Sequence, residues 1–351
     1  MMQGRSRWLQ WVLLVVVSAA FIALLELASL PAAFLIGPML AGIVAGTAGA
    51  EIRLPNLPYV GAQAIVGCLI AASIEIELFT SLASDWPIVL GATFATLAAS
   101  GLLGWLVSRW NVLPGTTAIW GSAPGAASAM VIMADAFGAD ARLVAFMQYV
   151  RVIMVSVAAA GIAGLFVDRS LLEAAPVIWF PPLDWPSFPA TLAVALVGAV
   201  AGHLLRLPSA AFLGPMILGV TLHLLGLVDF QLPEWLLAAS FAAIGWSIGL
   251  RFTRPIVAHA FRALPQIMIA VLILIAFCGA LAVVVARLTG VDALTAYLAT
   301  SPGGMDTVAM IAAASDGVDI NFIMSMQTMR FLIVLLLGPP VARYFAGKVK
   351  I

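Results

Sequence analysis

Charged side chains are scarce in this sequence. Only 9% of its 351 residues are Asp, Glu, Lys or Arg, whereas a soluble globular domain carries about 25%. This scarcity excludes a soluble globular protein, and it agrees with a hydrophobic share of 64% and a mean hydropathy of +1.14. Because the 16 basic and 16 acidic residues cancel, the net charge gives no reason to expect nucleic acid as a partner.

Residue types that bind metals or carry redox chemistry are also few. Cys68 and Cys278 lie inside apolar segments, where a packing role is more typical than a disulfide or a metal site. His203, His223 and His259 lie on different segments without ligand spacing, and no Walker loop, nucleophile elbow or zinc spacing is present. We therefore expect no enzymatic activity, and an integral-membrane oxidase is disfavoured.

Long apolar segments are what the sequence has in abundance. A helix needs roughly 20 apolar residues to cross a bilayer, and the chain supplies about ten to twelve such stretches. We expect an all-α polytopic membrane protein embedded in the lipid bilayer, beginning with a first span rather than a signal peptide. The segments lie at about 8–29, 31–50, 59–79, 86–108, 113–138 and 142–167, and then at about 188–205, 208–227, 235–250, 264–286, 292–315 and 319–345.

The second half of the sequence repeats the first at an offset of 177 to 179 positions. The matches include Gly37-Pro38-Met39 with Gly214-Pro215-Met216, Gly67 with Gly245, and Asp140, Gln148 and Arg151 with Asp319, Gln327 and Arg330. So small a drift in offset indicates a duplication with short loop insertions. We predict a first membrane repeat at 1–167, an external linker at 168–187 and a second membrane repeat at 188–351. The Gly-Pro-Met elements are typical of close helix packing.

The Lys and Arg residues distinguish two topologies. If each broken segment described below returns to the side it entered, 12 basic residues lie inside and 2 outside; if it crosses, the numbers are 9 and 5. The positive-inside rule favours the first topology. It predicts two inverted repeats, each of five transmembrane helices plus one broken or re-entrant segment, with both termini cytoplasmic. A re-entrant hairpin and a spanning discontinuous helix both remain open.

A helix-breaking run interrupts one apolar segment in each half. The first contains Ser122, Ala123, Pro124 and Gly125, and the second contains Thr300, Ser301, Pro302, Gly303 and Gly304. Hydrocarbon tolerates such a break only where protein or a water-filled cavity satisfies the freed backbone groups. A half-helix that begins at a break presents N–H groups and a positive dipole end, which attract anions. Duplicated breaks favour a transport site, although an ordinary Pro kink stays open.

Each half also has a Gln and an Arg three positions apart in an apolar segment, Gln148 with Arg151 and Gln327 with Arg330. Each pair shares one face of a helix. An Arg at such depth costs at least about 2.5–3.5 kcal/mol on insertion scales, so it should face the protein interior. One interpretation is a pair of cations that bind a carboxylate, which suits the guanidinium fork. The other is a structural arginine that caps carbonyl groups exposed by the break.

Asp306 has no acidic counterpart, because the first half has Ser128 at that position. It would lie in the second turn of a half-helix, where the dipole favours an acid. Asp306 could pair with Arg330, carry a coupling proton or Na⁺, or bind a cationic group of a substrate. This residue makes the two halves of the predicted site unequal.

The duplicated pattern P-G-[GA], then G-x-D about ten residues later, then Q-x-x-R, with Gly-Pro-Met in an earlier span, resembles the AbrB family of duplicated bacterial membrane proteins. The resemblance covers essentially the whole chain. Its members are often labelled ammonia monooxygenase or regulators of AidB expression, and the name is shared with an unrelated DNA-binding domain. The resemblance implies a multi-pass protein of the bacterial inner membrane that acts as a transporter. Ala127 and Ser128 depart from the family's acid after the second glycine, so a mechanism with two acids is not expected here.

These features favour a secondary transporter for a small organic anion, with a site near the membrane midplane between the two breaks. The predicted substrate-binding residues are Ser122, Ala123, Pro124, Gly125, Gln148, Arg151, Thr300, Ser301, Pro302, Gly303, Gly304, Asp306, Gln327 and Arg330. The alternative is a membrane-embedded ligand sensor or regulator that does not transport. We expect no cofactor other than a coupling Na⁺ or H⁺, and a homo-oligomer is left open.

Overall fold

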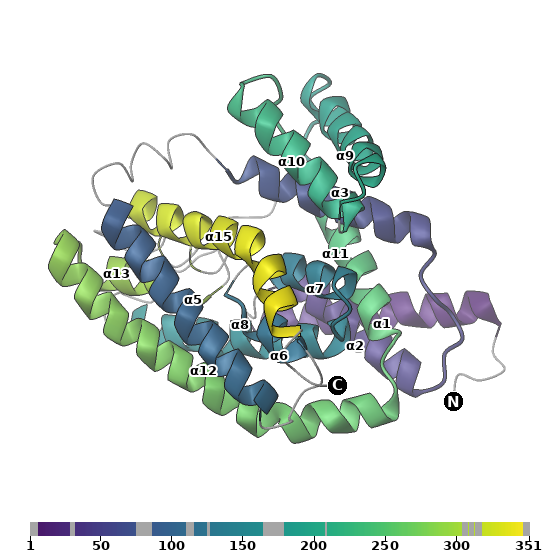
Figure 1. Cartoon of the computed structure of the whole chain (residues 1–351). Helices are drawn as coiled ribbons and strands as arrows, with labels where there is room; N and C mark the ends of the chain where they lie inside the picture. The colour runs from purple at the N-terminus through teal and green to yellow at the C-terminus, as the bar shows by residue number, and fades with distance from the viewer. Residues whose placement is uncertain are drawn as a thin grey trace. The chain divides into compact units, whose positions relative to one another are not determined.

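The computed structural model describes residues 6–28, 32–74, 86–109, 116–124, 127–163, 179–207, 209–303, 308, 312 and 318–346. Within these ranges every regular element is an α-helix, so the all-α prediction is confirmed. The helices, labelled in Figure 1, are α1 (Arg7–Leu27), α2 (Ala33–Thr47), α3 (Asn56–Ala72), α5 (Trp86–Arg109), α6 (Thr117–Ser122), α7 (Ala127–Ala136), α8 (Ala141–Ala163), α9 (Ser187–Leu204), α10 (Ala210–Leu224), α11 (Glu234–Gly249), α12 (Arg254–Thr289), α13 (Ala293–Thr300) and α15 (Ile320–Ala346).

Six of the described helices, α1, α5, α8, α9, α12 and α15, are long and apolar enough to cross a membrane. Their length and composition identify a membrane protein. By contrast, α2 and α10 have 15 residues each, which gives a length of about 22 Å against a hydrocarbon layer of about 30 Å. The prediction of five spans in each half therefore stays a prediction.

One helix begins earlier than the sequence pattern indicated. The segment predicted at 264–286 belongs to α12, which begins at Arg254 and continues through Pro265. A proline removes one backbone hydrogen bond in a helix interior but does not always end the helix. The 36-residue α12 is the longest of the described helices.

The chain forms two compact units, and each unit draws on both halves of the sequence. Unit 1 contains Met1–Glu75 and Pro176–His259, and unit 2 contains Ile76–Ala175 and Ala260–Ile351. The predicted repeats are therefore not compact units in themselves, and their boundaries stay a prediction. Residues 168–178 of the predicted linker lie outside the described residues.

In unit 1, the third helix of each half packs against the second helix of the other half, because α3 contacts α10 and α11 contacts α2. A Cβ on Gly67 would lie 2.5 Å from the carbonyl oxygen of Phe212, and one on Gly245 would lie 2.6 Å from that of Leu35. The two glycines are 178 positions apart and their two partners 177. The repeat in the sequence is therefore also a repeat in helix contacts.

Figure 1 shows α9 beside α10 in unit 1. A Cβ on Gly214 of α10 would collide with the carbonyl group of Gly198 on α9. Small residues allow the backbones of membrane helices to approach closely. The close packing predicted for the Gly-Pro-Met element of the second half is thus observed.

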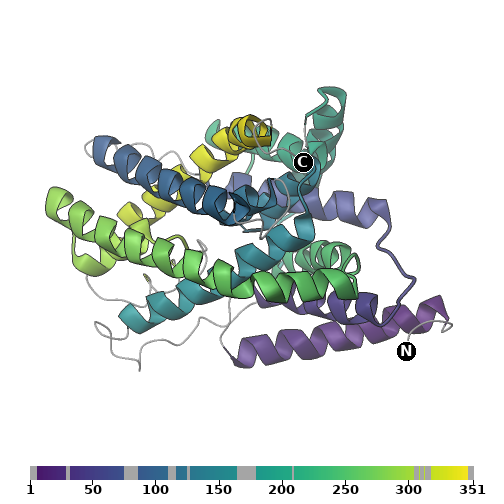
Figure 2. The ribbon, with the colours of Figure 1, turned by 60° about the horizontal axis from the view of Figure 1, so that its bottom comes forward.

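In unit 2, α5 and α12 lie side by side in both views (Figures 1 and 2). They share one buried apolar cluster with α8, α13 and α15, which includes Ala92 of α5, Ala282 of α12 and Leu298 of α13. Val308 and Ala312, which follow the second break, also belong to this cluster. Both broken segments lie in this unit.

Candidate functional site

The first break separates α6, which ends at Ser122, from α7, which begins at Ala127. Ala123 has extended backbone angles, φ −57° and ψ 123°, as expected for a residue that precedes proline. Pro124 is buried and has no N–H group to donate, which disfavours continuation of α6. Gly125 lies outside the described residues.

The second break has the same local geometry. α13 begins at an N-cap, in which Asp292 Oδ1 accepts from the backbone N–H of Thr295 at 2.8 Å, and it ends at Thr300. Ser301 has φ −59° and ψ 138°, and Ser301, Pro302 and Gly303 are buried. The predicted site residues Gly304 and Asp306 lie outside the described residues, so the pairing of Asp306 stays an open prediction.

Gln148 and Arg151 of α8 cap the C-terminal end of α6. Gln148 Nε2 donates to the carbonyl groups of Trp120 at 2.8 Å and Ala123 at 3.1 Å. Arg151 Nη1 donates to the carbonyl groups of Ala123 at 2.6 Å and Ser122 at 3.4 Å. These carbonyl groups have lost their helical partners at the break.

Gln327 and Arg330 of α15 make the equivalent bonds at the end of α13. Gln327 Nε2 donates to the carbonyl groups of Leu298 at 2.7 Å and Ser301 at 3.2 Å. Arg330 Nη1 donates to the carbonyl groups of Ser301 at 2.8 Å and Thr300 at 3.3 Å. Because a helix C-terminus carries partial negative charge, a guanidinium there is favourable. The capping role considered from the sequence is therefore observed in both halves.

The two capped breaks lie close together in unit 2. A Cβ on Gly303 would lie 3.3 Å from Cγ1 of Val155, one helical turn after Arg151 on α8. α13 contacts α8, and α15 contacts α6. The fold thus brings together predicted site residues from the two halves of the sequence.

Arg330 is a buried cation. Its side chain is 4% exposed, and in the described part of the chain no carboxylate lies within ion-pair distance of it. The end of α13 supplies at most about half a negative charge, so the described residues leave part of the positive charge uncompensated. Burying an uncompensated charge costs several kcal/mol. An anion held beside Arg330 would lower that cost.

Two hydroxyl groups connect the breaks to α5 and α12; Thr300 was among the residues predicted from the sequence, and Ser100 was not. Ser100 of α5 donates through Oγ to the carbonyl group of Ser122, and Thr300 donates through Oγ1 to the carbonyl group of Cys278 of α12 at 3.2 Å. Ser100 and Cys278 are 178 positions apart. The signal in the sequence was a hydroxyl-bearing residue inside an apolar segment, at the position equivalent to Cys278.

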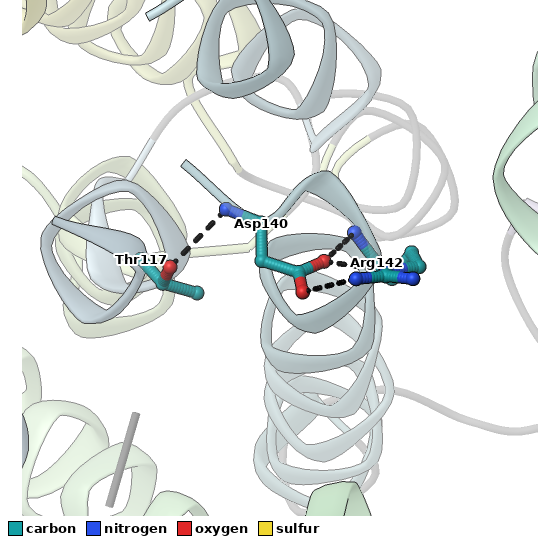
Figure 3. Close-up of polar contacts among 3 residues, drawn as sticks. All are labelled: Thr117, Asp140 and Arg142. Atoms are coloured by element: carbon teal, nitrogen blue, oxygen red, sulfur yellow. Dashed lines mark hydrogen bonds and ion pairs between the residues drawn. The ribbon is translucent and has the colours of Figure 1, made fainter. Parts of the chain in front are cut away.

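A hydrogen bond connects the N-terminal part of each short broken helix, α6 or α13, to the residue that precedes the next long helix, α8 or α15. The backbone N–H of Asp140 donates to Thr117 Oγ1 at 3.2 Å, and that of Asp319 donates to Thr295 Oγ1 at 3.0 Å. Figure 3 shows the first of these contacts, together with the ion pair between Asp140 and Arg142 at 2.7 Å. Burial alone would raise the pKa of Asp140, but the hydrogen bond and charge of Arg142 lower that pKa below its ordinary value.

Known proteins are similar to this sequence over most of its length. A family model described as "Transition state regulatory protein AbrB" matches residues 34–346, which include both breaks and all four capping side chains. A protein of Escherichia coli (strain K12) named "Putative regulator AbrB" is 45% identical over 339 residues, covering 96% of this chain and 97% of that protein. "Uncharacterized protein YhjN" of Bacillus subtilis (strain 168) is 26% identical over 295 residues, covering 80% of this chain and 77% of that protein. The chain therefore belongs to the AbrB family.

Proposed function

We propose that this membrane protein is a secondary transporter for a small organic anion, a carboxylate, in the bacterial inner membrane. Its two sequence repeats would be inverted, with both termini cytoplasmic. The substrate would bind near the membrane midplane, where the two breaks meet, and the site would open to one side of the membrane at a time. Na⁺ or H⁺ would couple transport to an ion gradient. We expect no enzymatic activity.

The observation that carries the proposal is the buried guanidinium of Arg330. Its hydrogen-bond partners are the carbonyl groups of Thr300 and Ser301 and the amide of Gln327, all of them neutral. A cation held in a protein interior by neutral groups attracts an anion strongly, because the local dielectric constant is low. Intramembrane ionisable residues typically mark a substrate or ion pathway.

The broken helices support transport over a purely structural arginine. A structural cap needs one cation at one helix end, whereas here two capped ends from separate repeats lie together in unit 2. Broken helices at equivalent positions of two repeats are the arrangement that transporters use to form a central site. The ends of α6 and α13 would then be fixed parts of that site.

A second candidate function comes from the names of the relatives. The family model and the Escherichia coli protein are both named as regulators. A membrane-embedded sensor could bind the same anion at the same two breaks without moving it across the bilayer. Such a sensor would need a regulatory partner, and a homo-oligomer is compatible with both functions.

Reconstitution into liposomes separates the two functions. Purified protein would be incorporated into vesicles, and uptake of radiolabelled carboxylates would be measured with an inward Na⁺ gradient, an inward H⁺ gradient, and no gradient. Uptake that depends on a gradient and is lost in Arg330→Gln supports the transporter. Saturable binding of a carboxylate without flux under any gradient supports the sensor.

A further inference from the structure

The two capping glutamines are equivalent in sequence but differ in one hydrogen bond. Gln327 Oε1 accepts from Nη2 of Arg330. Gln148 Oε1 has no hydrogen-bond partner, although the Gln148 side chain is fully buried, with 0% exposure. The first cap therefore contains an unused acceptor that the second cap lacks.

The unused atom of Gln148 is the amide oxygen and not the amide nitrogen. The other end of the amide faces two carbonyl oxygens, those of Trp120 and Ala123, at 2.8 and 3.1 Å. Only an NH₂ group can donate to both of them, so the orientation of the amide is fixed by its surroundings. The oxygen is left to accept from a group that is not part of the described chain.

Arg330 contributes an unused donor to the same unit. Its Nε–H has no hydrogen-bond partner, and its side chain is 4% exposed. Buried polar atoms in proteins are nearly always hydrogen-bonded, so each exception needs a partner such as a ligand or a bound water. Gln148 lies two turns before Val155 on α8, and Val155 Cγ1 lies 3.3 Å from the Cβ position of Gly303. Gly303 follows Ser301, whose carbonyl group accepts from Arg330. The acceptor and the donor therefore belong to one neighbourhood.

We propose that the site selects carboxylates that also carry a hydroxyl group, an inference that rests on the anion binding proposed above. A carboxylate oxygen accepts from Nε of Arg330, and the hydroxyl donates to Oε1 of Gln148. The donor is a hydroxyl and not an ammonium group, because Arg151 and Arg330 would repel a second positive charge. The substrate class is thus a small hydroxycarboxylate.

A hydroxyl group on the substrate changes the binding selectivity of such a site more than an extra methylene group on the substrate does. A site built to hydrogen-bond a substrate hydroxyl rejects the analogue that lacks it, because a buried polar group is then left unpaired. A purely electrostatic site would bind a hydroxy acid and its deoxy analogue almost equally. Matched pairs of acids therefore test the role of Gln148 separately from the role of charge.

The test is equilibrium binding to the purified full-length protein, with each enantiomer of malate compared with succinate and each enantiomer of lactate compared with propionate. We expect one hydroxylated member of at least one pair to bind at least about tenfold more tightly than its deoxy analogue. Gln148→Leu should remove this preference, whereas Gly91→Ala, which lies outside the proposed site and has open space at its Cβ position, should keep it. The ratio of the affinities for a hydroxylated acid and its deoxy analogue, measured on the unmodified protein, tests the inference even if a variant folds poorly.

The outcomes are distinguishable. Equal binding of hydroxylated and deoxy acids would overturn this inference and leave the proposed anion site in place, with water as the partner of Gln148. A preference that survives in folded Gln148→Leu would also overturn it, because another residue would then recognise the hydroxyl. Binding of none of these acids would count against the proposed function as well as against this inference.

Discussion

Gly67 and Gly245 occupy equivalent helix crossings in unit 1, 178 positions apart in the sequence. Each allows the third helix of one half to touch the backbone of the second helix of the other half, at Phe212 and at Leu35. The two halves are therefore interlocked through a pair of matching contacts. Neither half could form this arrangement alone.

The first prediction concerns these two crossings. Gly67→Ala and Gly245→Ala should each lower the free energy of unfolding by about 1–3 kcal/mol, because a Cβ has no room beside the opposing carbonyl group. Gly91→Ala on α5 is the control, since nothing lies within 4 Å of its Cβ position, and it should be neutral or stabilising by about 0.5–1 kcal/mol. Thermal unfolding in detergent measures all three. Equal stability of the three variants would show that the crossings do not form.

The second prediction concerns the helix caps. Gln327→Leu should destabilise the protein more than Gln148→Leu, because Gln327 both caps α13 and accepts from Arg330, whereas Gln148 only caps α6. Each unsatisfied buried partner costs about 1–3 kcal/mol. Thr221→Val is the control, because the Thr221 hydroxyl donates to the carbonyl group of Ile217 within the same helix and the bond is exposed. The reverse order of the two Gln variants in a thermal unfolding series would argue against the observed bonding.

The third prediction concerns pH. Because Arg142 lowers the pKa of Asp140 in the folded state, the ion pair contributes stability above the ordinary carboxyl pKa of about 3.9, and this stability is lost as the pH falls through the lower folded value. The stability difference between the unmodified protein and Asp140→Asn should be constant from about pH 5 to 8 and shrink below about pH 4. The pair is partly exposed, so the difference should not exceed about 1 kcal/mol.

Arg142→Gln is the matched variant for the pH measurement. It keeps the carboxyl of Asp140 and its backbone hydrogen bonds but removes the guanidinium group that lowers the pKa of Asp140, so the acid dependence should weaken. An acid dependence that is identical in Arg142→Gln would assign it to other carboxyl groups.

The fourth prediction concerns topology. In a background without Cys68 and Cys278, a cysteine at Leu183, which is 39% exposed, should react with a membrane-impermeant reagent added outside intact cells. The proposed inverted repeats require the segment around Leu183 to be outside when the N-terminus is inside. Labelling that appears only after lysis would reject the inverted topology.

The breaks and their caps could be predicted from the sequence because each depends on an unusual local residue. Pro124 and Pro302 interrupt apolar runs, and Arg151 and Arg330 are charged where the neighbouring residues are not. Such residues stand out because hydrocarbon makes them costly. Because the sequence is duplicated, each of these unusual residues occurs twice, at equivalent positions of the two halves.

The tertiary partners could not be predicted in the same way. That Gly67 meets Phe212, or that Ser100 donates to the carbonyl group of Ser122, depends on helix crossings that local periodicity does not encode. The start of α12 at Arg254 was missed because Pro265 resembles a helix start, whereas the helix continues through it. The division into two units was missed because it cuts across the repeat.

The role of Arg330 in anion binding is tested most directly by equilibrium binding of a small carboxylate to the unmodified protein, to Arg330→Gln and to Arg330→Lys. Arg330→Lys keeps the charge but loses the planar fork, so it should bind more weakly than the unmodified protein and more tightly than Arg330→Gln. We expect Arg330→Gln to fold and to lose at least about 30-fold in affinity, the effect of removing one member of a buried charged pair. Unchanged affinity in folded Arg330→Gln would contradict an anion site at Arg330 and leave the arginine as a structural cap.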